Sequence, residues 1–146
     1  MIKLFSSAFK DGQRIPNKYS HRLANVNPTL NIIDTPEGTN SLVIIVHDPD
    51  APIGDYTHWI MWNIEPSCAE IEEKFKPKKA IVGVNDFGNN KWYGPAPPSG
   101  THRYIFELFA LDKELSLSNE ASNSELRVAM DGHVIDSTTL IGLYSA

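Results

Sequence analysis

The sequence predicts a mainly β fold: a Greek-key β-sandwich of two antiparallel sheets with one or two short helices. Ten prolines and nine glycines in 146 residues gather in clusters that separate short apolar segments, as in all-β domains. Those segments are rich in β-branched and aromatic residues, which favour strands. Only one stretch combines a helix cap with a helical apolar repeat, and many strands with few helices are typical of a sandwich. The length fits a single domain over residues 1–146.

The expected strands follow from these apolar segments. Five consecutive aliphatic residues within 41–47 predict a strand buried on both faces. The aromatic-rich segments 58–65 and 102–111 predict two further core strands. Shorter or less regular segments predict four more strands, at residues 2–9, 29–34, 80–84 and 138–144.

One helix is expected near the C-terminus. Ser122 and Glu125 form a capping box, which satisfies backbone N–H groups at a helix start. An apolar stripe with helical spacing follows, consisting of Leu126, Ala129, Met130, His133 and Val134. Residues 69–76 predict a second, weaker helix.

Composition excludes several classes of function. The net charge of −5 and the lack of a basic stripe argue against nucleic-acid binding. The densest basic run, at Lys74, Lys76, Lys78 and Lys79, follows an acidic run and is interpreted as solvated surface. No apolar stretch approaches the roughly 18 residues of a membrane span, and the N-terminus lacks the apolar core of a signal peptide. A single cysteine, Cys68, suits a reducing compartment, so a cytoplasmic protein is expected.

Two stiff loops carry the candidate chemistry. Residues 48–52 read Asp-Pro-Asp-Ala-Pro and precede His58-Trp59, and residues 94–98 read Gly-Pro-Ala-Pro-Pro and precede His102. Proline and glycine fix unusual loop shapes without regular secondary structure. Strand alternation places His102 with Tyr104 on one face, and His58 with Ile60 on one face. If the two strands are neighbours, Asp48, His58 and His102 can converge at one sheet edge.

These two motifs together resemble the phosphatidylethanolamine-binding protein family, which includes the Raf kinase inhibitor protein. The resemblance spans roughly residues 2–144, and the short length resembles the family's bacterial and archaeal branch. It implies a small anion-binding pocket, in which members of that family hold phosphate or a phosphoethanolamine headgroup without a metal. By motif position the ligand-binding residues are Asp48, Pro52, His58, Gly94, Ala96, Pro97, Pro98, His102 and Tyr104.

The resemblance implies further features. The family commonly has a cis peptide before the last proline of the first motif, here Ala51–Pro52. Larger eukaryotic members carry an additional C-terminal helix over the pocket, so a more open site is expected in this chain. Prokaryotic relatives are often homodimers, and a dimer is the expectation here.

The leading interpretation is a non-enzymatic protein that binds phosphate, phosphorylated groups or other small anions, with no cofactor. One alternative is an inhibitor of a serine protease or kinase, which could present the loop 94–100 to a protease cleft. A less favoured one is a hydrolase or metal-dependent enzyme using Asp48, His58 and His102. Structural roles are expected for His21, His47 and a buried His133. If a pocket histidine binds the anion as imidazolium, Asp48 should raise its pKa above about 6.5.

Overall fold

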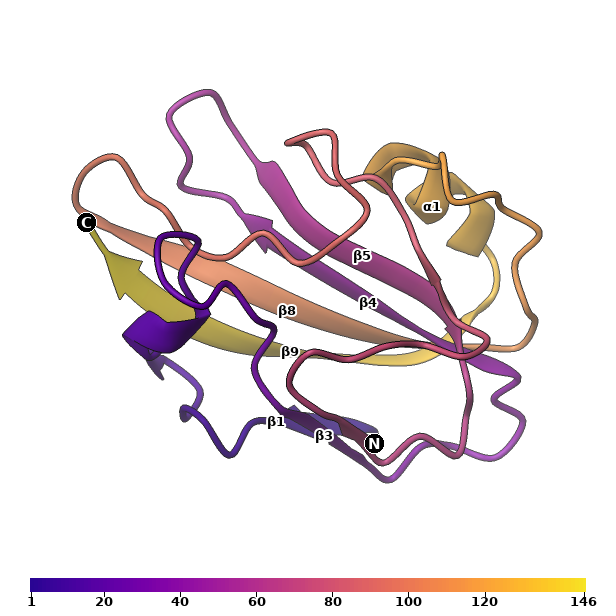
Figure 1. Ribbon diagram of the computed structural model, residues 1–146. Coiled ribbons are helices and arrows are strands. Elements are labelled where there is room, and N and C mark those ends of the chain that lie inside the picture. The colour runs from indigo at the N-terminus through magenta and orange to yellow at the C-terminus, as the bar shows by residue number, and fades with distance from the viewer.

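The computed structural model describes all 146 residues and shows two sheets (Figure 1). The smaller has the strand order β1 (Lys3–Phe5), β3 (Leu30–Ile33), β6 (Glu70–Ile71). The larger has the order β2 (Gln13–Arg14), β9 (Val134–Ser145), β8 (Thr101–Leu111), β4 (Ser41–Asp48), β5 (Tyr56–Ile64), β7 (Ile81–Val82). All neighbours are antiparallel except the short β2–β9 pair, which is parallel. The mainly β, two-sheet prediction is confirmed.

The larger sheet separates two apolar cores. Alternate residues of β4 face opposite sides: Leu42, Ile44 and Val46 belong to the core beneath the smaller sheet, whereas Val43 and Ile45 pack with the second core. The second core lies between the sheet and the helix α1 (Asn123–Met130). Figure 1 shows α1 beside β4 and β5 at one end of the molecule, with β1 and β3 below the large sheet. This double burial explains the unbroken aliphatic run in β4.

Helical structure is limited to α1 and one turn of 3₁₀ helix, Asn17–Tyr19. The capping box is confirmed: the Ser122 hydroxyl accepts from the backbone N–H of Glu125, whose side chain accepts from the backbone N–H of Ser122. The helix ends at Met130, earlier than the apolar stripe predicts, and Val134 already begins β9. Gly132, with φ +80°, turns the chain between the two elements. No helix of the chain has the length and apolar character needed to span a membrane.

The helix predicted for residues 69–76 is wrong. The segment forms the short strand β6 and then an irregular loop. Its backbone bonds to the buried side chain of Asn27, which donates to the carbonyl of Glu72 and accepts from the N–H of Phe75. These bonds compete with helical ones, and Pro77 disfavours helical backbone in the residue before it. The first strand is also shorter than predicted, covering only Lys3–Phe5.

The cis peptide expected at Ala51–Pro52 is absent, since the structure contains no cis peptide bond. The N–H of Gly54 donates to the carbonyl of Ala51 at 3.0 Å, which closes a four-residue turn with Pro52 in its second position. A trans proline fits this position, whereas a cis proline belongs at the third.

Candidate functional site

A cavity of about 270 Å³ opens at the end of the large sheet, where β4 ends and β5 and β8 begin. Both Pro-rich loops border it. The residues that line the cavity are Asp48, Ala51, Pro52, Ile53, Tyr56, His58, Phe87, Ala96, Pro97, Pro98, His102 and Tyr104. Its polar groups come from the strand ends and its apolar walls from the loops, an arrangement typical of small-molecule sites.

The innermost polar pair of the cavity is Asp48 and His102. Their side chains are 4% and 9% exposed, and His102 Nδ1 lies 2.6 Å from Asp48 Oδ2. A carboxylate can only accept, so His102 donates from Nδ1 and its Nε2 remains uncommitted. The other carboxylate oxygen of Asp48 accepts the backbone N–H of Asp50 at 2.8 Å. Both oxygens of this buried acid are therefore bonded, and its orientation is fixed.

A β-bulge places His58 in the cavity. Val46 pairs with Trp59, but the next residue, His47, pairs with Thr57, so His58 is an extra residue in β5. Bulges re-aim side chains. The His58 ring meets Tyr104 edge-on at 5.2 Å, on the Asp48 side of the sheet, whereas Ile60 packs in the second core. The prediction that His58 and Ile60 share a face is therefore wrong.

The His58 ring is bonded on one side only. Its Nδ1 lies 2.6 Å from the carbonyl oxygen of Tyr93, which can only accept, so Nδ1 carries a proton. Burial lowers the pKa of His58, against opposing effects of this hydrogen bond and of the Asp48 charge. The expected rise above the ordinary value is thus wrong for His58. At neutral pH its remaining nitrogen is an acceptor.

Tyr104 completes the base of the cavity. The residue is 1% exposed. Burial, together with the charge and hydrogen bonding of Asp48, raises the pKa of its phenol far above the ordinary value. Tyr104 therefore keeps its hydroxyl proton throughout the physiological range, in a hydrogen bond to Asp48.

An ion pair holds the first motif loop against the start of β8. Arg103 donates to the carboxylate of Asp50 from Nε, Nη2 and its own backbone N–H, each at 2.9 Å. This contact fixes the 48–52 loop against the start of β8. It also lowers the pKa of Asp50 to about 2.

Aromatic rings form one wall. The Phe87 ring stacks on the Tyr93 ring with their centroids 3.4 Å apart, and Tyr93 stacks on His21 with a centroid distance of 3.9 Å. This stack supports Phe87 from behind. Phe87 in turn meets Tyr56 and His58 edge-on, with ring-centroid distances of 4.8 and 5.1 Å. The wall is thus built from three loop or strand segments that are distant in the sequence.

Eight of the nine residues expected at the site line the cavity, and Gly94 does not. The N–H of Gly94 donates to Asn25 Oδ1 at 2.7 Å. A Cβ atom at this position would lie 2.1 Å from the carbonyl oxygen of Tyr19, so glycine allows two loops to touch. Sequence reasoning missed Ala51, Ile53, Tyr56 and Phe87. Tyr56 and Ala51 lie beside motif residues and could have been included, but no local signal marks Phe87.

The other histidines lie outside the cavity. His47 projects to the opposite face, where Nδ1 contacts Asp55 at 2.6 Å and Nε2 contacts Glu107 at 3.0 Å. His133 is not buried as expected, because its side chain is 38% exposed and its Nδ1 pairs with Asp112 at 2.8 Å. No group of three or more His, Cys, Asp or Glu side chains is arranged to hold a metal ion.

The comparisons with known proteins place the chain in a family. The model of the phosphatidylethanolamine-binding protein family matches residues 5–145, so the chain belongs to that family. A UPF0098 protein of Pyrococcus horikoshii is 47% identical over 148 residues, covering 95% of this chain and 74% of the relative. A UPF0098 protein of Chlamydia trachomatis is 38% identical, covering 98% of both chains.

Solved structures show the same fold. The crystal structure of a phosphatidylethanolamine-binding protein homologue from Chlamydia trachomatis superimposes with a TM-score of 0.96 at 37% identity, covering 99% of this chain and 97% of that one. An Escherichia coli structure described as a member of the mammalian family gives a TM-score of 0.93 at 25% identity, covering 99% and 98% of the two chains.

Proposed function

We propose that this protein is a non-enzymatic binding protein for small anions, with a phosphate or phosphorylated group as the ligand, held in the cavity at the end of β4, β5 and β8. The observation that supports the proposal is the buried Asp48–His102 pair at the cavity base. The membership of the family fits a binding role. The apolar walls exclude water and strengthen the few polar contacts inside.

The anion binds opposite the uncommitted nitrogen of His102. When His102 is protonated, its Nδ1–H neutralises Asp48 and its Nε2–H faces the cavity as a charged donor. Tyr104, whose hydroxyl is hydrogen-bonded to Asp48, lines the cavity beside this pair. His58 contributes an acceptor while neutral, which suits a ligand that carries its own proton, such as a monohydrogen phosphate. The site is small and open, so affinities in the micromolar to millimolar range are expected.

Asparagine substitutions test these roles while retaining the structural hydrogen bonds. The side-chain NH₂ of asparagine can replace Nδ1–H but offers nothing at the position of Nε2. His102→Asn should therefore keep its bond to Asp48 and lose sulfate and phosphate binding by at least about tenfold, as measured by titration calorimetry. His58→Asn should weaken phosphate more than sulfate. The control is His133→Asn, on the exposed Asp112 pair, which should bind as the wild type does.

Normal sulfate and phosphate binding by His102→Asn would refute the proposal. Chemical-shift mapping on the same samples locates the ligand, since an anion in this cavity perturbs His58, His102 and Tyr104 first.

The protease-inhibitor alternative depends on a projecting loop, and the structure gives it little support. In the 94–100 segment, Gly94, Pro95 and Pro97 are buried, and only Pro98, Ser99 and Gly100 are exposed. The N–H of His21 also donates to the carbonyl of Pro95, which holds the loop against the body of the protein. A segment tied down in this way does not project into a protease cleft.

A further inference from the structure

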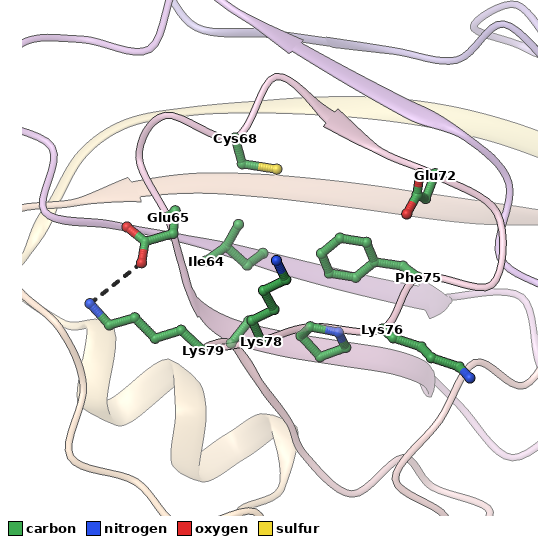
Figure 2. Close-up of a pocket in the computed structure, with 10 residues that line it drawn as sticks. Ile64, Glu65, Cys68, Glu72, Phe75, Lys76, Lys78 and Lys79 are labelled. Carbon is green, nitrogen blue, oxygen red and sulfur yellow. Dashed lines mark ion pairs between the residues drawn. The ribbon is translucent and has the colours of Figure 1, made fainter.

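A second cavity, of about 340 Å³, lies away from the anion site, between the end of β5 and the loop that follows β6. Figure 2 shows its residues. The apolar surface comes from Ile64, Phe75, Pro77 and Ala80, and the thiol of Cys68 points across the space. The polar rim consists of Glu65, Glu72, Lys76, Lys78 and Lys79. Its volume falls within the usual range for small-ligand pockets.

The wall of this cavity is fixed without any ligand. The buried Asn27 bonds the backbone of Glu72 at 2.8 Å and of Phe75 at 3.1 Å. Glu73 is anchored separately by Lys18 at 2.7 Å and by the hydroxyl of Tyr19 at 2.5 Å. The loop therefore holds an open apolar surface in place, and a ligand would not have to order it.

The charges on the rim are unequally satisfied. Lys79 pairs with Glu114 at 2.5 Å and with Glu65 at 3.6 Å. Lys76 and Lys78 have no carboxylate partner. In Figure 2 the ammonium of Lys78 points toward the space bordered by Ile64 and Phe75, whereas Lys76 points outward. An unpaired cation thus lies beside an apolar surface, which is the complement of an amphipathic anion.

We propose that this cavity binds a medium-chain alkyl carboxylate, with the alkyl chain on Ile64, Phe75 and Pro77 and the carboxylate on Lys78. The positive charge of Lys78 favours a negatively charged headgroup, and the apolar surface favours a ligand that also carries an alkyl tail. The site is separate from the anion cavity because the two share no lining residue. The lysine run, interpreted from the sequence as solvated surface, is exposed, but three of its four members, Lys76, Lys78 and Lys79, also line the rim of this site.

The single cysteine provides a direct readout. Cys68 is half-buried and lines the cavity, so a bound alkyl chain should shield it from iodoacetamide. Octanoate is the probe, and half-protection is expected in the millimolar range. Acetate tests the need for a tail and octylammonium tests the sign of the charge. Neither should protect Cys68 at the same concentration.

Variants of the rim should move the octanoate affinity in opposite directions. Lys78→Glu should weaken protection at least about tenfold, because it replaces attraction by repulsion. Glu72→Gln removes an unpaired rim carboxylate and should strengthen protection about two- to threefold. A general disturbance of the loop would not strengthen binding. Lys113→Glu, at an exposed lysine outside the cavity, is the matched control and should leave the protection of Cys68 by octanoate unchanged.

His102→Asn should leave octanoate protection intact, which separates this site from the anion cavity. Equal protection by octylammonium, or wild-type protection in Lys78→Glu, would overturn the proposal. Absence of protection up to the solubility limit of octanoate would overturn it as well.

Discussion

His47 and Asp48 are consecutive residues of β4 that project to opposite faces of the same sheet, and each forms a histidine–carboxylate pair. On one face, both ring nitrogens of His47 are bonded, to Asp55 and Glu107, and Glu107 also pairs with Arg127. On the other face, the ring of His102 bonds to Asp48 through Nδ1 alone, and a cavity adjoins the pair. The chemistry of the two pairs is the same, but only the second leaves a nitrogen for a ligand.

Residue type alone does not define a binding site. Burial disfavours the charged form of His47, but hydrogen bonds to Glu107 and Asp55 outweigh it and raise its pKa. Burial lowers the pKa of His58 at the cavity. The cluster of His47, Asp55 and Glu107, called the closed cluster below, thus favours a protonated His47 ring. The cavity, in contrast, holds the His58 ring, which resists protonation.

The largest expected effect separates Asp48 from its neighbour Asp50. Asp48→Ala leaves the buried Nδ1–H of His102 without its acceptor and should lower the free energy of unfolding by about 3 kcal/mol, in addition to abolishing anion binding. Asp50→Ala breaks a pair with Arg103 whose side chains are 31% and 53% exposed, and should cost at most about 1 kcal/mol. Urea unfolding at pH 7 measures both. An equal decrease in the free energy of unfolding for the two variants would contradict the roles assigned to Asp48 and Asp50.

A smaller effect should appear in the closed cluster. Because the pKa of His47 is raised in the folded state, its contribution to stability is complete below about pH 6.5 and is lost as pH rises through the folded value. His47→Asn should therefore destabilise the protein by about 1–3 kcal/mol near pH 5.5 and by less at pH 8.5. A difference that grew with pH would show that His47 is neutral in its cluster.

His58 should show the opposite pH dependence. Its pKa is lowered on folding, so its contribution is complete above about pH 6.5 and is lost as the pH falls through the folded value. The stability difference between the wild type and His58→Asn should therefore be larger at pH 8 than at pH 5, as measured by urea unfolding of both proteins. A difference that did not change with pH would mean that folding leaves the pKa of His58 unaltered.

Local signals in the sequence predicted the central strands, whereas most of the cavity residues were predicted from the resemblance to the family that the two motifs carry. The aliphatic run of β4 and the aromatic segments of β5 and β8 specify the central strands, and the Pro-rich motifs mark the cavity loops. The bulge at His58 was not predictable, since the register of β5 against β4 depends on pairing between strands. Phe87 reaches the cavity by stacking on Tyr93, a contact that no periodicity encodes.

The predicted helix at 69–76 failed for a similar reason. Its local pattern was outweighed by hydrogen bonds from Asn27, more than forty residues away in the chain. Long-range polar contacts of a single buried side chain leave no trace in the segment whose conformation they determine.

In the proposed function, His102 binds the anion as an imidazolium. Sulfate carries no proton of its own near neutral pH and offers only acceptors, so binding must draw a proton onto His102 wherever that ring is neutral in the free protein. Calorimetric titration with sulfate between pH 6 and 8.5, in two buffers of different ionisation enthalpy at each pH, counts that proton. We predict proton uptake that increases, and a sulfate affinity that falls, as the pH rises over this range. Sulfate binding with no proton uptake and an affinity that is constant over this range would contradict it.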